Sequence, residues 1–178
     1  LESYSRPRAN GIIALGLRED DRLIRVTLTD GNSQMLVASY NGKVVRFPED
    51  TVRPMGRTAT GVRAIKLDED GKDRVIGMIC VEEGSKESVL VISEKGFGKR
   101  TDLDDENGEP IYRVTNRGGK GVKTMNLTDK TGNLIGLEAV TDDQDLMLIT
   151  KSGTAIRMAM DTIRVMGRAT QGVKLIEL

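Results

Sequence analysis

The stretch VRPMGRTATGVR (residues 52–63) decides the fold, because a pattern of the same length recurs twice further along the chain. The two copies are YRVTNRGGKGVK at 112–123 and IRVMGRATQGVK at 163–174, and a shortened relative, YSRPRANGI, lies at 4–12. Each copy has an arginine just after its start, carries glycine plus an apolar residue near its end, and contains no acid. A short apolar run follows each one. Self-similarity of this kind predicts a repeat architecture.

The repeat has a period of about fifty residues. The glycines near the ends of these stretches are separated by 50, 60 and 51 residues, and they are Gly11, Gly61, Gly121 and Gly172. Inside each period a second glycine separates two apolar, strand-like runs; these turn glycines are Gly42, Gly96 and Gly153. We therefore expect three β-hairpins. Asn-Gly at 41–42 predicts a type I′ turn, whose two central residues need positive φ.

The predicted fold is all-β, a propeller-like array of four-stranded blades. In the first full unit the strands are expected at 12–17, 23–29, 34–40 and 43–48. The strands are almost continuously apolar, which is typical of sheets covered on both faces, as in radially stacked blades. The alternative is a β-sandwich with chance similarity among its hairpins, which a threefold recurrence disfavours.

We expect one domain over residues 1–178, with about three full repeats. Their approximate limits are 12–61, 62–121 and 122–172, and 1–11 and 173–178 are assigned to flanking blades. Because closed propellers usually need four or more blades, the expected arrangement is part of a larger array.

Composition excludes several classes of function. The chain has no histidine and a single cysteine, so a soft-ligand zinc site and histidine-based acid–base catalysis are both excluded, and we expect no catalytic residue and no metal site. No apolar run approaches eighteen residues, which argues against a membrane span, and no leader-like segment opens the chain. The lone Cys80 fits a reducing compartment, and cytoplasm is the expected location.

Charge is segregated within the repeat although the net charge is zero. We call residues 4–11, 52–63, 112–123 and 163–174 the basic segments; together they hold twelve basic and no acidic residues in 44 positions. If the repeats are arranged radially, these charges form a belt suited to the phosphates of double-stranded DNA, bound with little regard to sequence. The glycines at 118, 119 and 121 are expected to let backbone N–H groups approach phosphates. The candidate DNA-binding residues are Arg6, Arg8, Arg53, Arg57, Arg63, Arg113, Arg117, Gly118, Gly119, Lys120, Gly121, Lys123, Arg164, Arg168 and Lys174, and on the hairpin arms Lys43, Arg46, Lys99, Arg100 and Arg157.

The order and spacing of these segments closely resemble the C-terminal domain of the DNA gyrase A protein, over essentially the whole chain. The resemblance implies a β-pinwheel, a propeller variant in which neighbouring blades exchange strands, and a non-catalytic domain that wraps DNA around its basic perimeter. The family's box, Gln-Arg-Arg-Gly-Gly-Lys/Arg-Gly, is matched best by TNRGGKG at 115–121, which departs at its first two positions and resembles a later blade.

The resemblance also implies partners. These are the other domains of gyrase A, together with gyrase B, in an A2B2 complex that introduces negative supercoils in the bacterial cytoplasm. ATP and Mg²⁺ would serve other domains, so no cofactor is expected in this chain, and the catalytic tyrosine would lie outside it. Tyr4, Tyr40 and Tyr112 are accordingly expected to be structural.

Three alternatives fit the sequence less well. The related domain of topoisomerase IV shares the repeat but has a more degenerate box. A protein-interaction propeller of the WD or kelch type characteristically uses Trp-Asp or Gly-His pairs, and the chain has neither Trp nor His. A phosphate-binding loop of an enzyme fits poorly, because Lys120 is followed by glycine rather than by serine or threonine.

Overall fold

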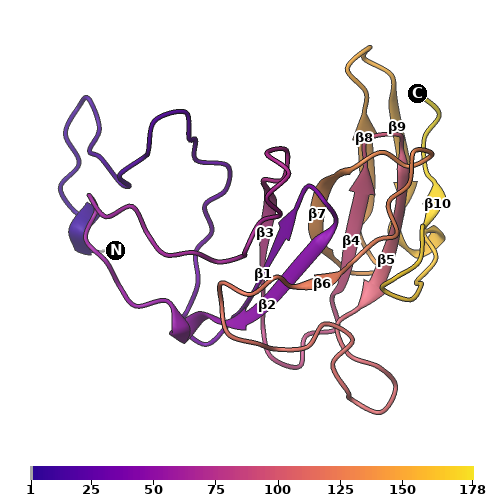
Figure 1. The fold of residues 1–178 in the computed structure, drawn as a ribbon, viewed down its shortest axis with the longest axis horizontal. Helices are drawn as coiled ribbons and strands as arrows, with labels where there is room; N and C mark the ends of the chain where they lie inside the picture. Colours follow the sequence, from indigo (N-terminus) through magenta and orange to yellow (C-terminus); the bar gives the residue numbers. More distant parts are fainter. Residues whose placement is uncertain (1) are drawn as a thin grey trace.

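The computed structural model describes residues 2–178, whose regular structure consists of β-strands and single-turn 3₁₀ helices (Figure 1). The strands are β1 (Gln34–Ser39), β2 (Lys43–Pro48), β3 (Val75–Val81), β4 (Ser88–Ser93), β5 (Phe97–Asp102), β6 (Val122–Lys123), β7 (Leu134–Val140), β8 (Asp145–Ile149), β9 (Ala155–Ala159) and β10 (Val173–Lys174). The 3₁₀ helices are η1 (Glu2–Tyr4), η2 (Glu49–Thr51) and η3 (Met160–Thr162). The all-β prediction is confirmed. None of the helices in this part of the chain has the length and apolar character that crossing a membrane requires.

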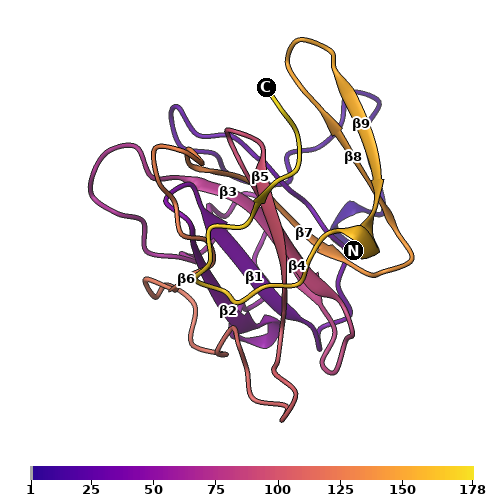
Figure 2. The same cartoon turned by 90° about the vertical axis from the view of Figure 1, so that its right-hand side faces the viewer.

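Two four-stranded sheets share one topology. Their strand orders are β3-β1-β2-β6 and β10-β5-β4-β7, and every named pair is antiparallel. In each sheet a hairpin supplies the two central strands, a long strand flanks its first arm, and a two-residue strand flanks its second arm. The third hairpin, β8–β9, forms a two-stranded sheet at the edge of the array (Figure 2).

A blade is not one continuous period of the sequence. The β1–β2 hairpin is completed by β3 on one side and by β6 on the other, and β6 belongs to the stretch 112–123 of a later repeat. Each sheet therefore draws strands from successive repeats. The prediction of strands at 12–17 and 23–29 is wrong, because neither range is a strand in the structure. Both ranges are equivalent to segments that pair with a hairpin lying earlier in the chain. Within residues 2–178, no hairpin pairs with either range.

The turn at Asn41-Gly42 differs from the predicted type. Only Gly42 has a positive φ, of 80°, whereas Asn41 does not, so the turn is not type I′. The Gly42 N–H donates to the Ser39 carbonyl at 2.9 Å, which gives a type I turn followed by a left-handed glycine. Asn41 is held instead by acids of the 68–73 loop, since its side-chain amide donates to Asp68 and Asp70.

The core lies between blades. Leu36 and Ala38 of β1 pack with Val89 and Val91 of β4 in the largest apolar cluster, and the odd-numbered side chains of β1 face a second cluster on the other side of the sheet. Both faces of a blade are therefore covered, which explains the nearly continuous apolar character of the hairpin strands.

Candidate nucleic-acid interface

The basic segments are joined end to end by one repeated hydrogen bond. The Nη1 of Arg57 donates to the Ile13 carbonyl at 2.8 Å. The equivalent contacts run from Arg117 to the Arg63 carbonyl at 3.4 Å and from Arg168 to the Lys123 carbonyl at 2.6 Å. We call the glycines near the ends of the basic segments, Gly11, Gly61, Gly121 and Gly172, the anchor glycines. In each case the middle arginine of one segment bonds to the residue two positions after the anchor glycine of the segment before it. These three half-buried arginines are therefore joints between repeats.

A second repeated bond reinforces each joint. Backbone N–H groups of Gly16, Lys66 and Asn126, each five residues after an anchor glycine, donate to carbonyls in the middle of the next basic segment at 3.0, 2.8 and 2.9 Å. The acceptors are the carbonyls of Ala59, Gly119 and Thr170. Because both bonds recur at all three joints, the four basic segments form one continuous line. The sequence repeat identified the segments but not these contacts.

Two hairpin-arm arginines fix where a basic segment begins. Arg46 is 5 % exposed and donates to the Tyr112 carbonyl at 3.1 Å and to Asp104 at 3.0 Å. Arg100, also 5 % exposed, donates to the Ile163 carbonyl at 2.9 Å and pairs with Asp142. The structure places both guanidinium groups inside the protein rather than on its surface. The expectation that these two arginines contact DNA is therefore corrected: each one holds the first residue of a basic segment in place.

Lys99 is a third buried cation among the predicted DNA ligands. Its side chain is fully buried, and its Nζ donates to the Gly167 carbonyl at 2.7 Å and to the Arg168 carbonyl. Burial, and secondarily the positive charge of Arg168, lowers the pKa of Lys99 to about 8. Lys99 therefore supports the last basic segment from inside the protein, and its ammonium group is not available at the surface.

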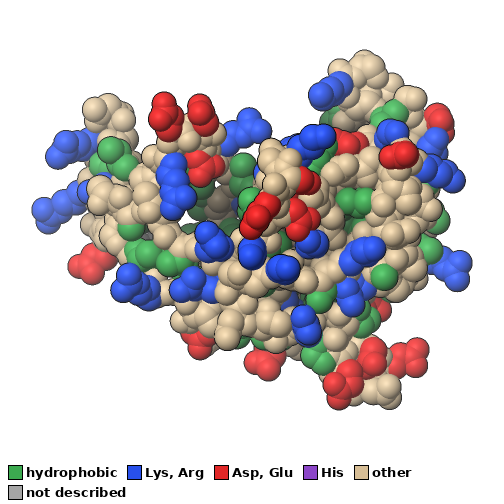
Figure 3. All heavy atoms as spheres, in the orientation of Figure 1, with side chains coloured by type: hydrophobic (Ala, Val, Ile, Leu, Met, Phe, Trp, Pro, Cys, Tyr) green, Lys and Arg blue, Asp and Glu red, His purple; other side chains and the backbone are tan. Residues whose placement is uncertain are grey.

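The remaining cations of the basic segments point outward. Exposed side chains occur at both ends of each full segment and on Lys120; they are Arg53, Arg63, Arg113, Lys120, Lys123, Arg164 and Lys174, and Arg6 and Arg8 are exposed in the first segment. Figure 3 shows Lys and Arg side chains in a band across the middle of one face, with most Asp and Glu side chains above and below it. On the hairpin arms, Lys43 and Arg157 are engaged by Asp68 and Asp145.

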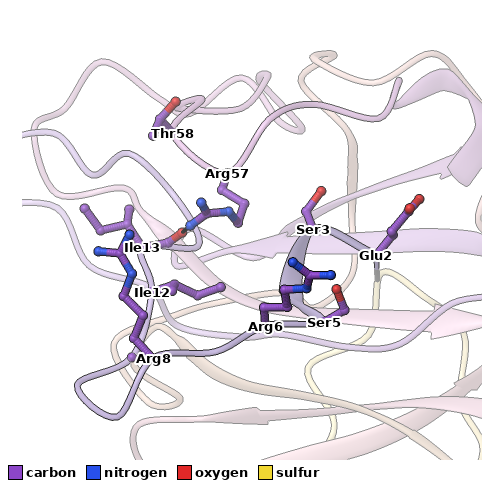
Figure 4. Close-up of a pocket in the computed structure, with 10 residues that line it drawn as sticks. Glu2, Ser3, Ser5, Arg6, Arg8, Ile12, Ile13, Arg57 and Thr58 are labelled. Carbon is purple, nitrogen blue, oxygen red and sulfur yellow. Dashed lines mark hydrogen bonds between the residues drawn. The ribbon is translucent and has the colours of Figure 1, made fainter.

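Two shallow pockets lie along this line. One of about 560 Å³ is lined by Arg6, Arg8 and Arg57, and Figure 4 shows the Arg57 guanidinium turned toward Ile13. The other, of about 450 Å³, lies between β2 and residues 113–122 and is lined by cations of that segment. Both are open and cationic, which suits an extended polyanion better than an enclosed small molecule.

The comparisons with known proteins agree with this architecture. The family model "DNA gyrase C-terminal domain, beta-propeller" matches residues 1–30, 34–82, 87–141 and 144–178. The chain belongs to this family. It is 46% identical over its whole length to the DNA gyrase A proteins of Staphylococcus aureus strains MRSA252 and COL, and it spans 19% of those proteins.

Solved structures share the fold of this chain. The crystal structure of the C-terminal domain of DNA topoisomerase IV matches 99% of this chain and 52% of that one, with a TM-score of 0.87 and 23% identity. A DNA gyrase A C-terminal domain matches 95% of this chain and 55% of that one, with a TM-score of 0.82 and 23% identity.

Two glycines of the 115–121 stretch, Gly118 and Gly121, have structural reasons to be glycine. A Cβ on Gly121 would lie 2.5 Å from the Val44 carbonyl oxygen, so only glycine lets β6 reach β2. Gly118 has a φ of 82°, and its N–H already donates to the Ala64 carbonyl at 2.6 Å. The expectation that these glycines expose N–H groups to phosphate is therefore not supported at Gly118, whereas Gly119 is exposed.

Two of the three tyrosines, Tyr40 and Tyr112, are placed as structural residues. Tyr112 is fully buried, and its hydroxyl and that of Thr124 share a hydrogen bond of 2.7 Å. Burial raises the pKa of Tyr112. The Tyr40 hydroxyl donates to Glu94 at 2.6 Å and thereby links two hairpins.

Proposed function

We propose that this chain binds duplex DNA along its line of basic segments and bends it, as a non-catalytic wrapping domain of the DNA gyrase A protein. The observation that carries the proposal is the repeated joint between segments, because it aligns exposed cations from successive repeats. We call the exposed cations of the four basic segments the basic belt; they are Arg6, Arg8, Arg53, Arg63, Arg113, Lys120, Lys123, Arg164 and Lys174. The half-buried arginines of the joints, and Gly119, lie beside the belt.

The continuous line of segments and its charge together fit bending. Phosphate contacts supply affinity without regard to sequence, and a duplex that follows a curved belt gains contacts that offset its deformation. Bending a short site costs on the order of 1–6 kcal/mol, so several repeats must contribute. The acids that flank the band in Figure 3 restrict a polyanion to one path.

The wider role follows from the relatives. Because the chain is 46% identical to part of gyrase A, we propose that it guides DNA to the cleavage core of that enzyme for ATP-dependent negative supercoiling. Its partners would be the other domains of gyrase A, and gyrase B in an A2B2 complex, in the bacterial cytoplasm. ATP and Mg²⁺ would be used elsewhere in that enzyme. The structural similarity to the topoisomerase IV domain keeps that enzyme as the second candidate.

Charge neutralisation at the belt tests the proposal. We expect the triple variant Arg53→Gln, Arg113→Gln, Arg164→Gln to bind a duplex more weakly and to lower the slope of log K against log salt by about 2–3, because each lost phosphate contact removes about 0.9. The measurement is fluorescence anisotropy of a labelled duplex at three or more salt concentrations.

The matched control neutralises three exposed lysines outside the belt, Lys72, Lys86 and Lys151. Its slope should equal that of the unmodified chain. An equal loss in both variants would mean that net charge, not the belt, determines binding. Absence of binding even at low salt would refute the DNA proposal and favour a protein-interaction propeller.

A further inference from the structure

An exposed apolar residue follows an arginine in each of the four basic segments. The exposed fractions of Val114 and Val165 are 40 % and 42 %. Single apolar residues on a surface are ordinary, but recurrence at one position of a repeat is not. We call Pro7, Pro54, Val114 and Val165 the apolar belt residues; they follow the exposed Arg6, Arg53, Arg113 and Arg164.

The backbone of the third basic segment holds Val114 in a fixed position. Two residues before it, Tyr112 is fully buried, and the Tyr112 carbonyl accepts a hydrogen bond from the Arg46 guanidinium at 3.1 Å. One residue after it, the Thr115 N–H donates to the Arg46 carbonyl at 2.8 Å, and Val114 itself forms a parallel β-bridge with Arg46. The same arginine therefore fixes the chain on both sides of an exposed valine.

The fourth basic segment holds Val165 by the same contacts. Ile163 is buried, and its carbonyl accepts a hydrogen bond from the Arg100 guanidinium at 2.9 Å. The Met166 N–H donates to the Arg100 carbonyl at 2.8 Å, and Val165 forms a parallel β-bridge with Arg100. Because the fold already orders both valines, a ligand that contacts them incurs little additional entropy cost at these positions.

The extended backbone does not by itself account for apolar side chains at these positions. Threonine suits a β-bridge much as valine does, and it adds a hydroxyl that water can solvate. The apolar belt residues lie in segments without an acid, and each one has an arginine as its chain neighbour. Figure 3 shows apolar side chains between the Lys and Arg side chains of the band. A ligand that fits this surface combines negative charge with an apolar part.

We propose that the apolar belt residues enter the minor groove of the bound duplex and wedge between base steps, while the arginine before each one contacts the adjacent phosphates. Apolar wedges of this kind partly unstack a base step and kink a duplex by about 20–90°. The minor groove of a wrapped duplex faces the protein at regular intervals, so a contact that recurs in successive repeats suits this ligand. The inference rests on the proposed function and adds to it the places where the DNA bends.

Wedging gives a preference that phosphate contacts alone do not give. Pyrimidine–purine steps such as TA are flexible and easily unstacked, so they lower the cost of a kink. A duplex in which each TA step is changed to AT keeps its base composition and its minor-groove acceptors but loses this flexibility. We expect the duplex with TA steps to bind at least about threefold more tightly than the duplex with AT steps.

The double variant Val114→Thr, Val165→Thr tests the wedge in the full 178-residue chain. Threonine keeps the branched shape and the β-bridge but replaces one methyl group by a hydroxyl. We expect the bend angle of a duplex labelled at both ends for energy transfer to fall. The affinity should fall about tenfold, because each buried methyl group contributes about fourfold (about 0.8 kcal/mol). The slope of log K against log salt should not change, because no phosphate contact is lost.

The matched control makes the same kind of change at two exposed branched residues outside the basic segments, Val26→Thr and Ile135→Thr. This variant should bind and bend DNA as the unmodified chain does, and circular dichroism checks the fold of both variants. An unchanged bend angle in the double variant, a lower salt slope in it, or equal affinity for the TA and AT duplexes would each overturn the wedge and leave the DNA proposal standing. Absence of binding by the unmodified chain would overturn both.

Discussion

Gly121→Ala should destabilise the chain by more than the conformational penalty of a left-handed alanine. Gly121 has a φ of 73°, and a non-glycine residue in this region costs about 1–2 kcal/mol. Its Cβ would also lie 2.5 Å from the Val44 carbonyl oxygen and 3.0 Å from Val45 Cγ2. Val44 is 1 % exposed in the centre of a sheet, so its carbonyl has little room to move. Such overpacking costs about 1–3 kcal/mol more.

Gly108→Ala provides the matched control. Gly108 has a φ of 79° with no atom within 4 Å of its Cβ position, so only the conformational cost applies. For a domain of this size, about 1 kcal/mol shifts the Tm by roughly 2–4 °C. We expect Tm to fall by about 2–8 °C in Gly108→Ala and by about 4–20 °C in Gly121→Ala, measured by calorimetry at one protein concentration. Equal Tm losses would refute the close approach of β6 to β2.

Three further predictions concern the buried and half-buried cations. The pKa of Lys99 is about 8 in the folded chain and 10.5 in the unfolded chain. Between these pH values the unfolded chain therefore binds more protons than the folded chain. The free energy of unfolding should accordingly rise with pH across this window, by up to about 3 kcal/mol. In urea titrations Lys99→Met should lack this component of the rise, and a parallel profile would contradict the assignment. Arg100→Gln should lower the free energy of unfolding by about 1–3 kcal/mol, because it leaves a buried carbonyl unpaired. The control is Arg157→Gln at the equivalent but exposed arginine, which should change the free energy of unfolding by less than about 0.5 kcal/mol. Similar denaturation midpoints for the two variants would contradict this. Arg168→Gln removes one bond of the last joint and should speed hydrogen exchange of the Asn126 amide roughly fivefold, while an unchanged rate would show that the second bond alone holds the joint.

The hairpins could be predicted from sequence because their signal is local. Gly42, Gly96 and Gly153 each end a turn with a left-handed residue, and the flanking apolar runs form the paired arms. Strand exchange could not be predicted from the repeat itself. The periodicity indicates that Val62, Val122 and Val173 are equivalent, but it does not identify the hairpin with which each of these residues pairs. Val44 and Val122 are paired across 78 positions of the chain.

The two roles of arginine follow from strand geometry. Arg46 and Arg100 lie in hairpin arms, and a blade covers both faces of such an arm, so a side chain there is buried whichever way it points. The sequence already predicted blades covered on both faces, and that prediction contained the signal that these arginines are internal. Arg57 gave no such signal, because its acceptor is a backbone carbonyl and every residue has one.

This division of roles limits the proposed DNA-binding surface to the basic belt and sets the salt dependence that we expect. Nine cations are exposed on the basic segments, whereas three hairpin-arm cations are buried and three middle arginines are bound to carbonyls. If every belt cation neutralised one phosphate, the slope of log K against log salt would be about −8, because each contact contributes about 0.9. A steeper slope would require the arginines of the joints to leave their carbonyls. Binding would then loosen the same bonds that align the segments, and DNA affinity would be coupled to the alignment of successive repeats.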